Sequence, residues 1–160
     1  MKIKVGFGTD VHRLKKGEEL ILGGIKIDHY KGTVAHSDGD VLVHAICDAL
    51  LGAANLRDIG YHFPDTSSEF ENIDSKILLK KIVELLAEHN WQIGNIDSTI
   101  ELQKPKIKDF IPDMKNALSE VIGIDTNNIS IKASTTEKLG FVGREEGIAA
   151  NVVVLIEKIN

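Results

Sequence analysis

Two potential metal ligands, Asp10 and His12, lie two residues apart near the start of the chain. In an extended segment, side chains at positions i and i+2 point to the same face, so this carboxylate and this imidazole can reach one ion. The pair alone is a weak signal, because Asp-x-His is common by chance and a metal site needs another ligand. His44 is the candidate for it, since a histidine within a largely apolar helix either donates to a core acceptor or binds a ligand.

Two histidines and one carboxylate leave a fourth tetrahedral position open, which is typical of catalytic rather than structural zinc. Asp40 and Asp48 lie four residues on either side of His44 and could orient its second ring nitrogen. They could equally be surface or capping residues, and Asp38 or Asp40 is also a plausible N-cap of the same helix. The residues by themselves therefore indicate a possible Asp/His/His metal site.

A polar cluster near the other end of the chain, residues 133–138 (ASTTEK), follows an expected strand. Its hydroxyls can donate to phosphate oxygens, and Glu137 can hold a Mg²⁺ ion that also bridges phosphates. An ordinary polar turn is the alternative interpretation. Arg144 lies between glycines in residues 143–147 (GREEG). Its guanidinium group could bind a phosphate or pair with a neighbouring carboxylate.

The elements that must position these side chains follow from the spacing of the apolar residues. The expected strands are residues 2–8, 20–22, 25–27, 96–102, 129–133 and 148–156. The expected helices run from 38 or 39 to about 55, from about 75 to just before Trp91, and from 107 to 122. Residues 57–72 show neither period and predict a long, functional loop. This order predicts an α/β chain with helices packed on a sheet, and it places Asp10 and His12 just past the end of the first strand.

Length and composition limit the possible classes of protein. A chain of 160 residues with 42% hydrophobic and 27% charged residues is typical of one globular domain, residues 1–160. The net charge of −5, without a basic block, argues against nucleic acid as a partner. The sequence has no signal-peptide pattern and no apolar stretch of membrane-spanning length, so we expect a cytoplasmic protein without membrane attachment. Cys47 is the single cysteine, so it cannot form a disulfide within the chain, and we assign it no chemical role.

Several segments together carry a family resemblance. They are residues 8–13 (GTDVHR), 35–40 (AHSDGD), His44 with 48–53 (DALLGA), 58–60 (DIG), 63–66 (FPDT), 135–141 (TTEKLGF) and 143–144 (GR). In type, order and spacing they resemble the 2-C-methyl-D-erythritol 2,4-cyclodiphosphate synthase family of the non-mevalonate isoprenoid pathway. The resemblance implies an α+β two-layer sandwich with a mixed sheet packed against helices, assembled as a homotrimer with active sites between neighbouring subunits.

The resemblance also implies the reaction, that of a phosphorus–oxygen lyase. The 2-phosphate of a cytidine diphosphate ester, 4-diphosphocytidyl-2-C-methyl-D-erythritol 2-phosphate, would attack the β-phosphorus and form the cyclodiphosphate. CMP would leave, so that CMP or CDP is the expected nucleotide ligand. One Zn²⁺ per subunit would be held by Asp10, His12 and His44, and Mg²⁺ or Mn²⁺ at Glu137 would bridge the substrate diphosphate.

The remaining site residues are likewise implied by the resemblance. The residues that support the transition state are His36 and Thr135, and Ser37 contacts the substrate phosphate. The loop over the methylerythritol end contributes Asp58, Ile59, Gly60, Phe63, Pro64, Asp65, Thr66 and Ser67. The residues around cytosine and ribose are Leu102, Gln103, Lys104, Pro105, Lys106, Ile107, Lys108, Ser134 and Thr135. Further substrate contacts are Asp10, Val11, His12, His36, Thr136, Glu137, Phe141 and Arg144.

Two other functions remain open. The first is a non-catalytic nucleotide- or metal-binding trimer that kept the scaffold, which loss of a ligand or catalytic residue would have favoured. The sequence keeps all five of the residues in question, which are Asp10, His12, His44, Thr135 and Glu137. The second is a zinc-dependent phosphohydrolase, which would need a general base near the metal-bound water, with Asp38, Asp40 or Asp65 as candidates.

Overall fold

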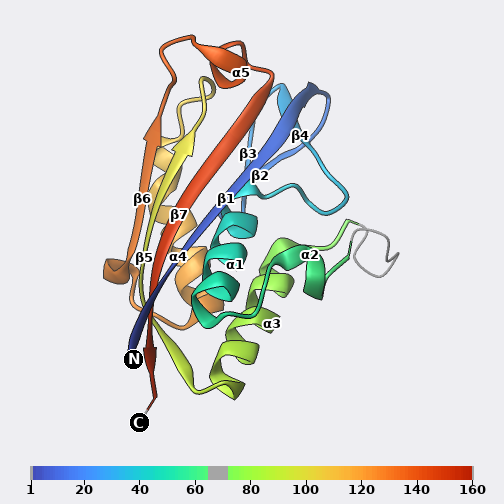
Figure 1. Cartoon of the computed structure of the whole chain (residues 1–160). Helices are drawn as coiled ribbons and strands as arrows, with labels where there is room; N and C mark the ends of the chain where they lie inside the picture. The colour runs from blue at the N-terminus through green and yellow to red at the C-terminus, as the bar shows by residue number, and fades with distance from the viewer. Residues whose placement is uncertain (1, 65–71, 160) are drawn as a thin grey trace.

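The computed structural model describes residues 2–64 and 72–159. Five strands form one sheet in the order β4 (Lys31–Val34), β1 (Ile3–Lys16), β7 (Gly147–Lys158), β5 (Trp91–Glu101) and β6 (Ile129–Ser134). Neighbouring strands are antiparallel except β5 and β6, which are parallel, so the predicted mixed sheet is confirmed (Figure 1). The two short predicted strands are confirmed as β2 (Leu20–Leu22) and β3 (Ile25–Ile27), which pair antiparallel as a hairpin.

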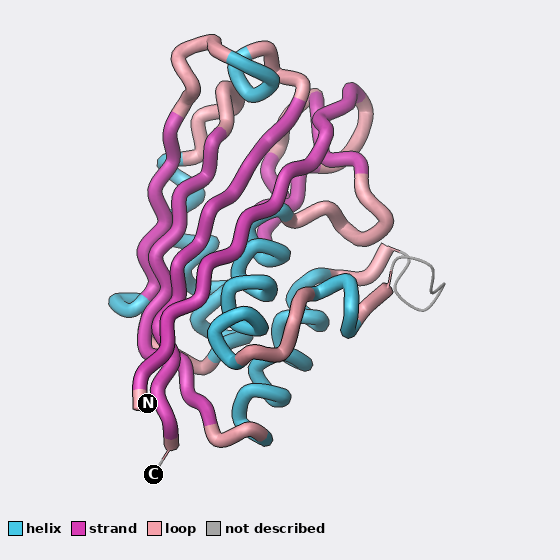
Figure 2. The backbone as a smooth tube through the Cα atoms, viewed as in Figure 1, coloured by secondary structure: helices cyan, strands magenta, loops and turns pink. Residues whose placement is uncertain are grey.

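The long helices cover one face of this sheet, as Figure 2 shows. They are α1 (Val41–Ala54), α3 (Ser75–Glu88) and α4 (Ile111–Ile122). Shorter helical turns are α2 (Ile59–His62), η2 (Lys108–Phe110), η3 (Thr126–Asn128) and α5 (Gly140–Gly143). Within the described ranges, no helix combines the length and apolar character needed to cross a membrane.

Helix α1 is apolar on most sides because it is enclosed on most sides. It packs against β1 and β7 on one side and against α3 on the other. Asp40 is its N-cap and accepts from the Val43 N–H, while Asn55 ends the helix in the left-handed region at a φ of 61°. Burial on both sides makes α1 the centre of the core.

The structure corrects several predicted boundaries. β1 continues to Lys16, so Asp10 and His12 lie inside the strand and not past its end. Polar residues after position 8 suggested that the strand ends there. The strand continues because it pairs with β7 as far as Arg13 and with β4 from Arg13 to Lys16. β5 begins at Trp91 and not near residue 96, because a register shift near Gly94 breaks the alternation that marks a strand. The short strand β4 and the helical turns α2 and α5 were not predicted, and α2 lies within the stretch 57–72 that was predicted to be a loop.

Two glycines on β1 allow the strand to cross α1 at very short range. A Cβ at Gly6 would lie 1.9 Å from the carbonyl oxygen of Ala49, and a Cβ at Gly8 would lie 2.1 Å from that of Ala45. No side chain fits there, so the backbones of strand and helix lie directly against each other. This contact places the next residues on the same face of β1, Asp10 and His12, beside the N-terminal half of α1.

We predict that Gly8→Ala destabilises the protein by about 1–3 kcal/mol or more, because the added methyl group must push β1 away from α1. Urea unfolding monitored by circular dichroism measures the change. Gly52→Ala is the matched control, since Gly52 lies in α1 with no atom near its missing Cβ. This control should gain about 0.5–1 kcal/mol from helix propensity. Equal stability of the Gly8 variant and the wild type would contradict the close crossing.

Candidate metal centre and two cavities

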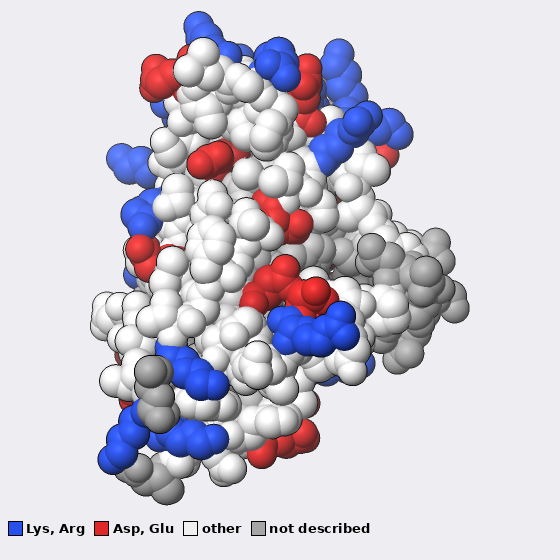
Figure 3. Space-filling model, in the orientation of Figure 1, with Lys and Arg blue, Asp and Glu red and all other residues white. Residues whose placement is uncertain are grey.

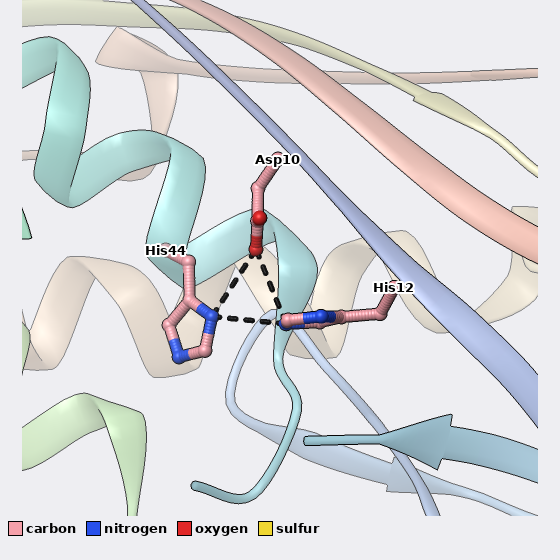
Figure 4. A group of neighbouring side chains, drawn as sticks. All are labelled: Asp10, His12 and His44. Carbon is pink, nitrogen blue, oxygen red and sulfur yellow. Dashed lines mark hydrogen bonds and ion pairs between the residues drawn. The ribbon is translucent and has the colours of Figure 1, made fainter. Parts of the chain in front are cut away.

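Asp10, His12 and His44 form a triangle of potential ligand atoms. Asp10 Oδ2 lies 3.2 Å from His12 Nε2 and 3.2 Å from His44 Nδ1, and the two nitrogens are 3.1 Å apart. Figure 4 shows all three groups converging on one point from β1 and α1. In the part of the chain that the structure describes, this is the one cluster of three or more such side chains that could hold a metal ion.

The size of the triangle fits a tetrahedral metal. Ligand atoms bound at zinc–nitrogen and zinc–oxygen distances of about 2.0–2.1 Å lie about 3.3 Å apart along a tetrahedral edge. The three observed separations match one face of such a tetrahedron. The other carboxylate oxygen of Asp10 accepts from the Val11 N–H at 2.9 Å, which turns Oδ2 toward the histidines. The residues present therefore fit a divalent ion with a fourth position open.

The charge around the triangle also favours a cation. Burial lowers the pKa of His44, but the hydrogen bond and charge of Asp10, together with the charges of Asp40 and Asp38, outweigh burial and raise the pKa overall. The positive form is thus stabilised in a half-buried position. A divalent ion that replaces the proton would meet the same negative field.

The structure confirms the capping interpretation of Asp40, which is the N-cap of α1, and turns both Asp40 and Asp48 to backbone donors instead of to His44. Asp40 is fully buried and accepts from the N–H groups of Gly23 at 3.0 Å and Gly24 at 2.7 Å, besides capping α1. Asp48 accepts from the Ile59 N–H at 2.8 Å. Both carboxylates satisfy backbone donors, because spacing along a helix alone does not say which way a carboxylate turns.

Two serines take the place of these aspartates. Nε2 of His44 lies 2.8 Å from Ser75 Oγ and 3.1 Å from Ser37 Oγ. Ser75 is the first residue of α3 and was not among the predicted site residues. Its contact with His44 is tertiary, so no local pattern could have revealed it.

A cavity of about 310 Å³ opens beside the metal ligands. Its lining includes predicted site residues from five segments of the sequence, together with other residues. The predicted lining residues are Asp10, His12, His36, Ser37, His44, Ile59, Gly60 and Phe63, and the others are Ala35, Asp48, Ile73 and Leu78. Asp58, the N-cap of α2, accepts from the Tyr61 N–H and so supports Ile59 and Gly60. Asp65, Thr66 and Ser67 lie outside the described residues.

A second cavity, also of about 310 Å³, contains the segment predicted to enclose the nucleotide. It is lined by Leu102, Gln103, Pro105, Lys106, Ile107, Lys108, Ser134 and Thr135, with Ile111 and Ala133. Lys104 instead pairs with Glu145 at 3.4 Å. Among the described residues, none lines both this cavity and the metal cavity. The two predicted halves of the site therefore line separate cavities of the chain.

The other predicted residues are elsewhere. Val11 alternates with Asp10 and His12 along β1 and lines a third cavity with Phe141 and Arg144, which His12 also borders. There Arg144 pairs with Glu146, its Nε and a carboxylate oxygen being 3.1 Å apart, so the carboxylate-pairing interpretation of Arg144 is the one observed. The Thr136 hydroxyl donates to the Leu139 carbonyl at 2.7 Å.

We predict that His44→Ala abolishes stoichiometric metal binding, because only two of the three proposed ligands, Asp10 and His12, then remain. The measurement is metal content by atomic emission after loading with zinc and dialysis. His89→Ala is the control, since His89 contacts the Leu85 carbonyl at the far end of α3 and should leave one metal ion per chain. Retention of stoichiometric zinc by the His44 variant would show that the third ligand is a different residue.

Comparison with known proteins places this geometry in a family. Residues 3–157 match the family model described as the YgbB family. A Bacteroides fragilis protein named 2-C-methyl-D-erythritol 2,4-cyclodiphosphate synthase is 67% identical over 159 residues, which are 99% of this chain and 100% of that protein. A Porphyromonas gingivalis protein of the same name is 56% identical, covering 96% of this chain and 94% of its own.

Solved structures share the fold. A structure described as the bifunctional IspDF from Campylobacter jejuni has a TM-score of 0.95 at 42% identity, covering 99% of this chain and 43% of that one. A structure described as a CDP complex of IspF from Plasmodium falciparum has a TM-score of 0.88 at 35% identity, covering 99% of this chain and 98% of that one. With the family model matched almost from end to end and the fold shared with these structures, the chain belongs to the YgbB family.

Proposed function

We propose that this chain converts 4-diphosphocytidyl-2-C-methyl-D-erythritol 2-phosphate to 2-C-methyl-D-erythritol 2,4-cyclodiphosphate and CMP. The observation that carries the proposal is the Asp10, His12 and His44 triangle opening into a cavity lined by His36 and Ser37. Relatives matched along their whole length are named for this synthase, and a solved relative is described as a CDP complex. The step belongs to the non-mevalonate isoprenoid pathway.

The metal ion proposed for the triangle is Zn²⁺, which when bound supplies a Lewis acid and a template for the phosphate. The chain's own residues do the positioning. His36 and Ser37 line the cavity next to the ligands, where an imidazole and a hydroxyl can donate to phosphate oxygens. Ile59, Gly60 and Phe63 form a more apolar wall for the methylerythritol carbons. Holding attacking and leaving oxygens in line is the main requirement of phosphoryl transfer.

Glu137 is proposed to hold Mg²⁺ or Mn²⁺ at the diphosphate. It lies after β6 in the left-handed region, at a φ of 53°, and its N–H donates to Thr135 Oγ1 at 3.3 Å. The turn thus keeps one carboxylate and one hydroxyl together at the edge of the nucleotide cavity. A cation held by a single carboxylate takes its other ligands from water and from phosphate oxygens, as Mg²⁺ commonly does.

The separation of the two cavities supports a shared active site. We propose a homotrimer in which the metal cavity of one subunit meets the nucleotide cavity of its neighbour. The sheet face opposite the helices exposes large apolar side chains, namely Ile3, Val5, Phe7, Val11 and Val153. Figure 3 shows a largely white area along these strands, interrupted by a few Asp and Glu side chains, with most Lys and Arg toward its margins. Such a surface is suited to contact with other copies of the chain.

The hydrolase alternative finds little support in the described residues. Asp40 is buried and its carboxylate accepts from three backbone N–H groups, so it cannot serve as a base at a metal-bound water. Asp38 accepts from Ser75. Asp65 lies outside the described residues. The intact ligand triangle likewise gives no reason to prefer a non-catalytic trimer. The lyase class, the single domain over residues 1–160 and the cytoplasmic location stay predictions.

The reaction is tested by incubating the protein with the cytidine substrate, Zn²⁺ and Mg²⁺ and following the products by phosphorus NMR. We expect a cyclic diphosphate and an equal amount of CMP. No water enters this reaction, so oxygen-18 from labelled water should be absent from both products. Linear phosphates that carry the label would contradict the proposal and favour hydrolysis.

The shared site predicts complementation between two inactive variants. His44→Ala removes a metal ligand and Thr135→Ala removes a hydroxyl of the nucleotide cavity, so each alone should lose most of its turnover. Subunits mixed by refolding at equal amounts should regain about a quarter of the wild-type turnover, because one interface in four then joins two unaltered halves. No recovery, in mixed trimers verified by mass spectrometry, would place both residues in the site of one chain.

A further inference from the structure

We propose that Ser75 and Asp38 form a positioning pair that fixes the tautomer and ring orientation of His44, so that Nδ1 faces the metal ion. Ser75 is completely buried at the start of α3. Its Oγ is 2.8 Å from His44 Nε2, while Nδ1 points toward Asp10 and His12 (Figure 4). The pair thus connects α3 to the metal centre. The inference rests on the metal site within the proposed function and not on the reaction.

The directions of the hydrogen bonds follow from the Asp38 carboxylate. Its Oδ2 accepts from the Ser75 N–H at 2.9 Å, and its Oδ1 accepts from the Asp40 N–H at 3.1 Å. The Ser75 hydroxyl donates to the same Oδ1. Because an ionised carboxylate can only accept, the hydroxyl hydrogen of Ser75 is directed to Asp38. Only lone pairs of Ser75 Oγ are then left for His44.

When Nδ1 binds the metal ion, the single proton of neutral His44 is on Nε2, which donates to Ser75. The Nδ1 lone pair then faces the ion between Asp10 Oδ2 and His12 Nε2. Ser37 Oγ is also near Nε2, at 3.1 Å. Ser75 Oγ is closer, and its hydroxyl hydrogen is donated to the Asp38 carboxylate. An acceptor on the non-ligating nitrogen is what holds metal-binding histidines in place.

Backbone hydrogen bonds bring this pair to His44. The Asn72 N–H donates to the His36 carbonyl at 2.8 Å, and the Asp38 N–H donates to the Ile73 carbonyl at 3.2 Å. The segment before α1 and the segment before α3 therefore run side by side. These contacts involve only main-chain atoms, so removing the Ser75 hydroxyl leaves them in place and acts mainly on the imidazole.

The first test compares the zinc affinities of Ser75→Ala and wild type by competition with a chromophoric chelator, without turnover. We expect the dissociation constant for zinc to rise about 10- to 100-fold, the usual effect of losing such a partner. Ser98→Ala is the matched control, because Ser98 is another buried serine and donates to the Ser130 carbonyl at 2.8 Å in the sheet. It should lose stability but keep its zinc affinity. An unchanged affinity in Ser75→Ala, or an equal loss in both variants, would overturn the proposal.

The second test needs no variant and so does not depend on the folding of one. Long-range proton–nitrogen NMR of the zinc-loaded protein distinguishes a protonated from a metal-bound imidazole nitrogen. We expect His44 to show a protonated Nε2 and a metal-bound Nδ1. A protonated Nδ1 with metal on Nε2 would overturn the tautomer assignment, whether or not the protein catalyses the proposed reaction.

Discussion

The candidate metal centre depends on the close crossing of β1 over α1. Gly6 and Gly8 carry no Cβ, so the strand lies against the carbonyl groups of Ala49 and Ala45. Residues on the same face of the strand then meet the first turns of the helix, where His44 is. A side chain at either glycine would lift the strand and separate Asp10 and His12 from their third partner. The packing of backbone on backbone is thus the condition for the site's geometry.

Two carboxylates, of Asp38 and Asp40, hold the segment between β4 and α1 in its place. Asp40 caps α1 and also accepts from the N–H groups of Gly23 and Gly24, which ties the β2–β3 hairpin to the helix. Burial raises the pKa of Asp40, and the backbone N–H bonds oppose that rise without cancelling it. Asp38 ties the same segment to α3. His36 and Ser37 lie next to these anchored residues, so the cavity wall is preorganised by contacts outside the cavity.

The sequence predicted the elements whose pattern is local, and it failed where a distant partner decides. The three long helices and the Asp10 and His12 pair follow from spacing alone. The full length of β1 does not, because its polar half is a strand only through pairing with β4 and β7. Ser75 could not be recognised from its neighbours, since its contact with His44 spans two helices. The nucleotide segment was assigned by resemblance, and the structure places it in a cavity apart from the metal ligands.

The central claim is that metal and nucleotide are held by different subunits of one assembly. Crystals grown with zinc and CDP, measured at the zinc absorption edge, test it directly. We expect an anomalous peak bounded by Asp10, His12 and His44, with the cytosine of the same site enclosed by residues 102–108 of a neighbouring chain. A peak elsewhere, or a cytosine and a metal ion held by one chain alone, would contradict it.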